Sequence, residues 1–274
     1  MRSDFIILNG FDRSGTSAVT RMLAAHPKVE LIMQPFNSGF VRDRMYEIPK
    51  QDEPFPEADL FFSDLQENRL NESLIKSGWH EKHSSTLKHV PGQLHVVKTT
   101  INHMIQQWMN ANAPSIDVWG IWREPEDVIR SIITNGFQDQ WYSDALYKLI
   151  PTVMGDANLK AQFSQFTASL DSPVRITTFL FAVRSYFFFS HIKAGRVINF
   201  ERVKRDANAL NELLNHYGLE EYDFSDESDK DLNIIGKRLS EKDKIEFAEV
   251  DKGYIDEVLL PVRNVMKVKH NIDG

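Results

Sequence analysis

The stretch from Phe5 to His26, FIILNGFDRSGTSAVTRMLAAH, constrains the fold more than any other part of the chain. Its first five residues, Phe5–Asn9, are mostly apolar and have the length of a strand buried on both faces. A loop with two glycines follows, and from Thr16 the apolar residues return at helical spacing until His26 precedes a proline, which disfavours further helix. The stretch therefore predicts a strand, a glycine-containing loop and a helix. Loop amides and the first N–H groups of such a helix form a binding site for an anion.

The spacing of Gly10 and Gly15 is that of a nucleotide-binding P-loop, G-x-x-x-x-G-K-[ST]. The lysine of that pattern is replaced by Thr16, although a triphosphate normally needs a cation at this point. The only cation inside the loop is Arg13. An ordinary strand-to-helix turn without a ligand is the alternative interpretation of the loop.

Further short apolar runs alternate with segments of helical periodicity. This alternation predicts an α/β fold with a mainly parallel central sheet of about five strands flanked by helices. Ligands of such sheets bind at the carboxyl ends of the strands. The expected strands are Phe5–Asn9, Val29–Met33, His95–Lys98, Asp117–Trp122 and Arg196–Phe200; the expected helices include Thr16–His26, Ile101–Asn112, one beginning at Pro125, Val174–Lys193 ended by Gly195, and Ala207–Tyr217.

Two cations stand at the ends of predicted strands. Lys98 ends the run HVVK, and a lysine there needs either a nearby anion or an exit to water at the sheet edge. Arg123 follows the run DVWGIW, and its guanidinium can bind a phosphate through two hydrogen bonds. A salt bridge at the end of the strand is the alternative for Arg123.

Three motifs in this order resemble those of the sulfotransferases that use 3′-phosphoadenosine 5′-phosphosulfate (PAPS). The first is Arg13-Ser14-Gly15-Thr16-Ser17, which is similar to the family's loop for the 5′-phosphosulfate. The second is Lys98-Thr99-Thr100, at the place of a lysine-containing motif. The third is the run from Arg123 to Ser131, REPEDVIRS, which matches R-x-P-x-D-V-x-x-S. The resemblance implies a P-loop-like sulfotransferase fold.

The resemblance also implies roles for these residues. Arg13 and Lys98 would act on the phosphosulfate as catalytic residues, and Arg123 with Ser131 would hold the 3′-phosphate. A sulfuryl group would move from PAPS to a hydroxyl or amine of an unidentified small-molecule or carbohydrate acceptor, and the product would be 3′,5′-phosphoadenosine. No metal is expected. The cofactor-binding residues would be Arg13, Ser14, Gly15, Thr16, Ser17, Arg123 and Ser131.

The general base of the relatives is missing from its usual places. Thr100 stands where cytosolic members have histidine, and Gln34 where many carbohydrate and tyrosyl sulfotransferases have glutamate. We therefore expect His103 to be the catalytic base, in the first turn of a helix that begins near Ile101, where the helix dipole would keep the imidazole neutral. A buried polar histidine without a catalytic role is the alternative. Glu30, Asp43 and Glu47 are weaker candidates.

Two other functions compete with this one. A P-loop nucleotide kinase would need a cation after Gly15 and a magnesium-binding acid at a later strand end. A catalytically inactive protein that binds phosphoadenosine would explain the missing base.

Composition and net charge limit the classes of partner that the chain is expected to bind. The 274 residues carry a formal net charge of −7, which disfavours nucleic acid and anionic membranes as partners. The chain has no cysteine, and its N-terminal apolar run is too short for a signal peptide. The apolar segment Phe179–Ile192 is too short to span a bilayer and is interrupted by Arg184. We expect a cytoplasmic protein.

The chain length fits a single domain, residues 1–274, with residues 37–94 as an insertion that binds the acceptor. Within the insertion, His80, His83 and His89 are expected to be solvated rather than to bind a metal. Gly236-Lys237-Arg238 stands where cytosolic members close a basic loop over the 3′-phosphate, but in a different order.

Overall fold

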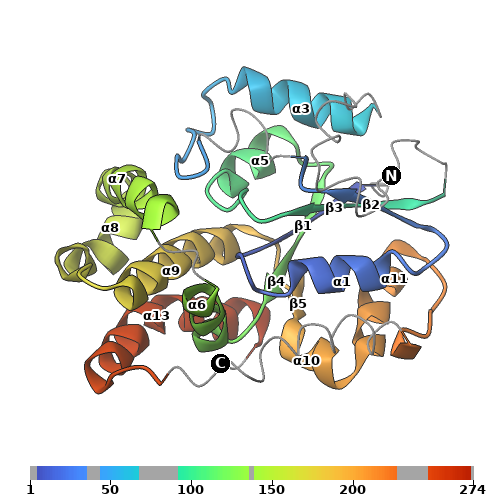
Figure 1. The fold of residues 1–274 in the computed structure, drawn as a ribbon. Coiled ribbons are helices and arrows are strands. Elements are labelled where there is room, and N and C mark those ends of the chain that lie inside the picture. The colour runs from blue at the N-terminus through green and yellow to red at the C-terminus, as the bar shows by residue number, and fades with distance from the viewer. Residues whose placement is uncertain (1–4, 36–43, 68–91, 136–138, 227–245, 273–274) are drawn as a thin grey trace.

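The fold is built on a five-stranded sheet in which every neighbouring pair of strands is parallel (Figure 1). The computed structural model describes residues 5–35, 44–67, 92–135, 139–226 and 246–272. The strand order is β2-β3-β1-β4-β5, so the predicted α/β fold with a parallel sheet is confirmed. The strands are β1 (Phe5–Gly10), β2 (Val29–Met33), β3 (Leu94–Thr99), β4 (Asp117–Trp122) and β5 (Val197–Asn199).

Helices cover both faces of the sheet, and each face has its own apolar core (Figure 1). On one face, α1 (Thr16–Leu23) packs with α10 (Phe200–Arg205), η3 (Ala207–Leu210) and α11 (Asn211–Tyr217) against side chains such as Ile6 and Leu8. On the other face, α5 (Gln106–Asn112), α6 (Pro125–Thr134), α9 (Pro173–His191) and α13 (Glu249–His270) pack against side chains such as Ile7 and Val97. Alternate residues of β1 thus point into different cores, as the twofold period of a strand requires.

The central helix of the second face is α9, which packs on α13, α6 and α5. Ser172 caps its N-terminus by accepting a hydrogen bond from the amide of Arg175, and Pro173 occupies the first turn. The helix ends earlier than the predicted Lys193, because Ile192 is already extended. Gly195 was expected to end the helix; instead it has a φ of 73° in the turn that leads into β5.

Other expected helices are present with modified bounds. The segment Ala207–Tyr217 is a 3₁₀ turn, η3, followed by α11, and Gly218 ends it in the left-handed conformation. Between α6 and α9 lie α7 (Asp139–Gly155), α8 (Ala157–Phe163) and η2 (Ser164–Ser169). None of the helices in the described ranges has the length and apolar character needed to cross a membrane.

The predicted insertion, residues 37–94, is only partly described. It contains α3 (Pro56–Gln66), and nearby side chains pack on α5: Phe55 meets the ring of Trp108 edge to face, at 5.6 Å between ring centroids. The indole of Trp108 also donates a hydrogen bond to the carbonyl of Glu53, at 3.2 Å. This part of the chain is therefore fastened to the helix that follows β3. The binding of an acceptor here stays a prediction, and Asp43, His80, His83, His89 and Gly236–Arg238 lie outside the described residues.

Candidate anion-binding site

The topology of the sheet brings the three motifs to one place. From β1 the chain passes over one face through α1 toward β2, whereas from β4 it passes over the other face through α6 and α9 toward β5. The connections therefore diverge between the carboxyl ends of β1 and β4, which is the position where open parallel sheets bind ligands. The first motif follows β1 and the third follows β4, while Lys98 lies beside Leu8 on the other neighbour of β1.

The loop between β1 and α1 is tightly folded. Arg13 and Gly15 both have positive φ, of 68° and 92°, and the amide of Ser14 donates to the carbonyl of Phe11 at 3.0 Å. A Cβ atom at Gly10 would lie 2.6 Å from Ser14 Oγ and 2.7 Å from Thr16 Cγ2, so the loop closes directly over the end of β1. Gly15 is thus favoured by its positive φ, and Gly10 by the side chains that pack against its Cα.

The loop leads into the N-terminus of α1. Gly15 is the N-cap residue and has no side chain with which to cap the first amides of the helix. Its carbonyl accepts from the amides of Ala18 and Val19, whereas the hydroxyl of Thr20 turns back to the carbonyl of Thr16 at 2.9 Å. The first amides and the positive end of the helix dipole are therefore directed to the same side as the loop, where they favour an anion.

Arg123 connects the third motif with the first. It is 6% exposed, and its Nη1 donates to the main-chain carbonyl of Arg13 at 3.0 Å. The exposed side chain of Arg13 in turn donates through Nε to the buried hydroxyl of Ser131, at 3.2 Å. Residues 118 positions apart, which the resemblance assigned to a single nucleotide, are thus in contact.

Two carboxylates lie near Arg123 but do not hydrogen-bond to it. Its closest approaches to Asp127 and Glu201 are 3.7 and 3.9 Å. Its Cζ also lies 5.6 Å from the centre of the Phe200 ring, the ring that covers Gly15. Arg123 is therefore held by packing, by the loop carbonyl and by ion pairs with Asp127 and Glu201, so the salt bridge that the sequence left open as an alternative is present. Its Nε has no hydrogen-bond partner among the described residues.

Lys98 is buried at the end of β3, with 2% of its surface exposed. Burial lowers the pKa of Lys98 to about 8, and the negative charge of Asp12 in the loop partly opposes this shift. The ammonium group makes no hydrogen bond or ion pair with any residue that the structure describes. The main-chain amide of Gln34 donates to the carbonyl of Lys98 at 2.8 Å, which places the end of β2 beside it.

Several buried polar atoms at this end of the sheet have no hydrogen-bond partner among the described residues. They include both amide atoms of Asn9, the hydroxyl of Ser14 and Nε of Arg123. A polar group buried without a partner costs about 1–3 kcal/mol, so such a cluster indicates a site that a polar ligand completes. Sequence reasoning assigned no binding role to Asn9 or Phe200; the only signal was that each lies at the end of a strand.

The predicted position of His103 in the first turn of a helix is wrong. The helix predicted from Ile101 begins only at Gln106, so His103 lies in the loop before α5 and not in a first helical turn. The hydroxyl of Thr99 accepts from the amide of Ile101 and donates to the side chain of Asn102, which holds the loop away from helical geometry. The pKa of His103 is well below its usual value because the ring is buried and lies beside the positive charge of Arg184.

Arg184 is the unexpected neighbour of His103. It projects from the middle of α9, is 2% exposed, and donates through Nη2 to His103 Nδ1 at 2.9 Å and to the carbonyl of Thr100 at 2.5 Å. Its Cζ lies 4.7 Å from the centre of the Phe11 ring, in the loop after β1. Arg184 therefore contacts both the segment that follows β1, through Phe11, and the segment that follows β3, through Thr100.

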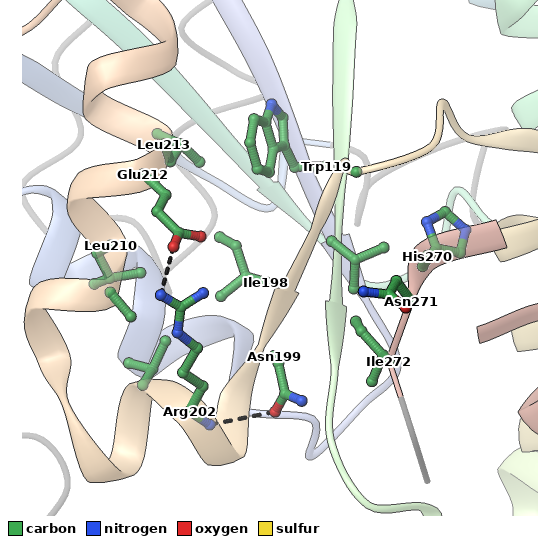
Figure 2. A pocket seen from close by; sticks show the side chains of 14 residues that line it. Trp119, Ile198, Asn199, Arg202, Leu210, Glu212, Leu213, His270, Asn271 and Ile272 are labelled. Atoms are coloured by element: carbon green, nitrogen blue, oxygen red, sulfur yellow. Dashed lines mark hydrogen bonds and ion pairs between the residues drawn. The ribbon is translucent and has the colours of Figure 1, made fainter. Parts of the chain in front are cut away.

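A separate pocket of about 380 Å³ lies along the free edge of β5 (Figure 2). Its walls include Trp119 of β4, Ile198 of β5, the ion pair of Arg202 with Glu212, and His270 with Asn271 at the end of α13. None of the predicted site residues lines it. The pocket and the candidate anion-binding site are thus different places on the protein.

The described residues contain no group of three or more histidine, aspartate or glutamate side chains arranged to hold a metal ion. No protein-family model matches the chain, and no match to it was found among curated proteins.

Proposed function

We propose that the protein is a PAPS-dependent sulfotransferase. The observation that carries this proposal is the contact of the first and third motifs: Arg123 bonds to the carbonyl of Arg13, and Arg13 bonds to Ser131. Each motif alone has an ordinary structural explanation. Their convergence at the switch point of the sheet, around unpartnered polar atoms, favours a ligand with two separate anionic groups.

The residues fit the two ends of such a nucleotide. Arg123 and Ser131 supply a guanidinium and a hydroxyl for the 3′-phosphate, and the loop amides with Arg13 supply donors for the 5′-phosphosulfate. Lys98 adds a buried cation on the other side of β1. An anion beside Lys98 would replace the water that its ammonium group has lost and would raise its lowered pKa.

PAPS supplies an activated sulfuryl group, whose bond to the 5′-phosphate oxygen breaks as a bond to the acceptor oxygen or nitrogen forms. Arg13, Lys98 and the amides of α1 stabilise the charge on the leaving phosphate, as in other transfers that rely on positioning and electrostatics. The acceptor is a small molecule or carbohydrate. His103 as the group that takes its proton stays a prediction.

A non-catalytic protein that binds phosphoadenosine is the second candidate. It is favoured by one observation: the side chains at the two usual base positions, Thr100 and Gln34, cannot accept a proton at neutral pH. The non-catalytic candidate and the sulfotransferase candidate would use the same anion-binding site, and they differ only in whether the sulfuryl group is transferred.

The decisive experiment compares the thermal stabilisation of the protein by 3′,5′-phosphoadenosine with that by ADP and by ATP with magnesium. At a hundredfold excess over the dissociation constant, we expect stabilisation by the 3′-phosphorylated nucleotide of roughly 5–10 °C. Arg123→Ala should abolish this shift. The control Arg202→Ala, which removes an exposed ion pair with Glu212 elsewhere, should retain it.

Each outcome decides between the candidates. A preference for ATP with magnesium that is indifferent to Arg123 would replace the proposal by a nucleotide kinase. Selective binding of 3′,5′-phosphoadenosine, without product from PAPS on a broad panel of phenols, alcohols, sugars and amines, would favour the non-catalytic protein. The absence of any shift would overturn both.

A further inference from the structure

Arg184 is a buried cation without a carboxylate partner among the described residues. It lies in the middle of α9 with 2% of its surface exposed, between the rings of Phe11 and Tyr46 at 4.7 and 5.8 Å from Cζ. A guanidinium remains protonated at all physiological pH values and can only donate hydrogen bonds. Burying this cation costs desolvation free energy, so the groups that accept its hydrogen bonds are the place to look for its role.

One acceptor of Arg184 is Nδ1 of His103, at 2.9 Å. Because Arg184 cannot accept a hydrogen bond, Nδ1 must carry the lone pair and the neutral imidazole must carry its proton on Nε2. A second proton on the ring would have to occupy Nδ1, directly against the guanidinium. Arg184 therefore fixes both the tautomer and the neutral state of His103.

The ring has little freedom to adopt another arrangement. It is 1% exposed and lies between Phe11 of the loop, at 5.9 Å between ring centroids, and Phe188 of α9, at 5.2 Å. Nδ1 points to Arg184, so Nε2 lies on the opposite edge of the ring. The group that His103 offers to a ligand is thus a hydrogen-bond donor.

We propose that Arg184 is a positioning residue that holds His103 as its Nε2–H tautomer, and that His103 donates a hydrogen bond to a sulfuryl oxygen of bound PAPS. His103 then does not accept the acceptor's proton, which passes to water instead. This inference rests on the proposed function. It assigns His103 a part in binding the charged group, alongside Lys98. A neutral histidine that acts as a donor because its pKa is low has precedent as a catalytic device.

The first test reads the tautomer directly and needs no substrate. In protein labelled with ¹⁵N-histidine, the His103 signals, identified among the nine histidines by their loss in His103→Gln, should show a protonated Nε2 and an unprotonated Nδ1 at neutral pH. Arg184→Lys, which keeps a donor, should preserve this pattern, whereas Arg184→Met should shift the signals toward a mixture of tautomers. A protonated Nδ1 in the wild type would overturn the proposal.

The second test compares affinities for PAPS and for 3′,5′-phosphoadenosine, which lacks the sulfuryl group. His103→Phe should weaken PAPS binding by about tenfold or more and leave 3′,5′-phosphoadenosine binding unchanged, because only PAPS carries the charged group to which the lost hydrogen bond is made. His103→Gln, whose amide can donate from a similar position but cannot serve as a base, should restore most of the loss.

The two proposals fail in different ways. If neither nucleotide binds the wild-type protein, the sulfotransferase proposal is wrong, while the tautomer measurement still tests the role of Arg184. If both nucleotides bind and His103→Phe affects neither selectively, His103 is not a donor to the sulfuryl group. Equal loss of turnover in His103→Gln and His103→Phe, with PAPS affinity unchanged, would instead support the predicted base.

Discussion

Arg123 donates a hydrogen bond to the main-chain carbonyl of Arg13, at 3.0 Å, so that two arginines from separate motifs are held together. The positive φ of Arg13 presents its carbonyl to Arg123 while its side chain reaches Ser131. The backbone of the first motif thus positions the guanidinium of the third. The guanidinium of Arg123 is only partly balanced by Asp127 and Glu201, at 3.7 and 3.9 Å, and a phosphate could add the hydrogen bonds that these carboxylates do not make.

The pair formed by Arg13 and Ser131 should behave as one unit in nucleotide binding. Arg13→Ala and Ser131→Ala should each weaken 3′,5′-phosphoadenosine binding, by roughly three- to thirtyfold, because each removes a donor and releases the other side chain. The double variant should lose less than the product of the two effects. Isothermal titration calorimetry measures the four affinities, and strict additivity would show that the 3.2 Å hydrogen bond between them has no bearing on the ligand.

Lys98 should make the stability of the ligand-free protein depend on pH. Its pKa is about 8 in the folded protein, against an ordinary value of 10.5, so below pH 8 it is charged in both states and the fold carries the full cost of burying it. Between pH 8 and 10.5 the folded protein loses this proton first and wild-type stability should rise. Lys98→Met should therefore be more stable than wild type at pH 7, by up to about 3 kcal/mol, and the difference should vanish near pH 10.5.

Urea unfolding at several pH values tests this expectation. The control Lys252→Met removes a half-exposed lysine and should show no such trend. A constant difference between Lys98→Met and wild type across this range would mean that the lysine is not desolvated. Affinity of the wild type for 3′,5′-phosphoadenosine should fall at alkaline pH, and Lys98→Met should bind it weakly throughout.

The sheet and the tight loop between β1 and α1 could be predicted because they depend on local signals. Val29–Met33 and Asp117–Trp122 were predicted with their observed bounds, since both are apolar runs of strand length. Gly10 and Gly15 indicated a tight loop, and in the structure neither position has room for a side chain: a Cβ atom would lie 2.6 Å from its nearest neighbour at Gly10 and 2.4 Å at Gly15. The positive φ of Arg13, a residue that rarely adopts it, had no signal in the sequence.

The setting of His103 could not be predicted because its determinants are not local. Ile101, Ile105 and Trp108 have helical spacing and are all buried, but the hydrogen bonds of Thr99 keep the first part of this segment in a loop. Arg184, 81 residues away, decides the state of the imidazole. The one sequence signal for Arg184 was a cation in an otherwise apolar segment, and it indicated no partner.

Tyr217 should be a determinant of stability at the other end of β4. Its hydroxyl donates to Asp117 at 2.7 Å and accepts from the indole of Trp119 at 2.9 Å, and burial with the bond to Asp117 raises the pKa of Tyr217. Tyr217→Phe leaves the indole N–H without its acceptor and should cost about 1–3 kcal/mol in urea unfolding. Tyr147→Phe, at a side chain that is 82% exposed, is the matched control and should change stability by less than about 0.5 kcal/mol.

Nucleotide binding should distinguish this effect from one on the site. Because Asp117 and Tyr217 lie at the opposite end of β4 from Arg123, Tyr217→Phe should retain wild-type affinity for 3′,5′-phosphoadenosine at temperatures where it is folded. A change in affinity without a change in stability would contradict the purely structural role.

Gly15 should tolerate no side chain, for two separable reasons. Its φ is 92°, and a Cβ atom would lie 2.4 Å from the Phe200 ring, so Gly15→Ala should cost roughly 2–4 kcal/mol from backbone strain and overpacking together. Gly195→Ala has a comparable φ of 73°, and no described heavy atom lies within 4 Å of its Cβ, so it should cost only about 1 kcal/mol.

Phe200→Leu separates the two contributions at Gly15. In that background Gly15→Ala should cost little more than Gly195→Ala, because the ring that it would strike is gone, and urea unfolding of the four proteins measures the difference. An undiminished cost would mean that the loop geometry, not the ring, excludes the side chain. Phe200 also lies under Arg123, so the single variant Phe200→Leu should weaken 3′,5′-phosphoadenosine binding while Gly195→Ala leaves it unchanged. The ring would then link the glycine that shapes the loop to the arginine that binds the phosphate.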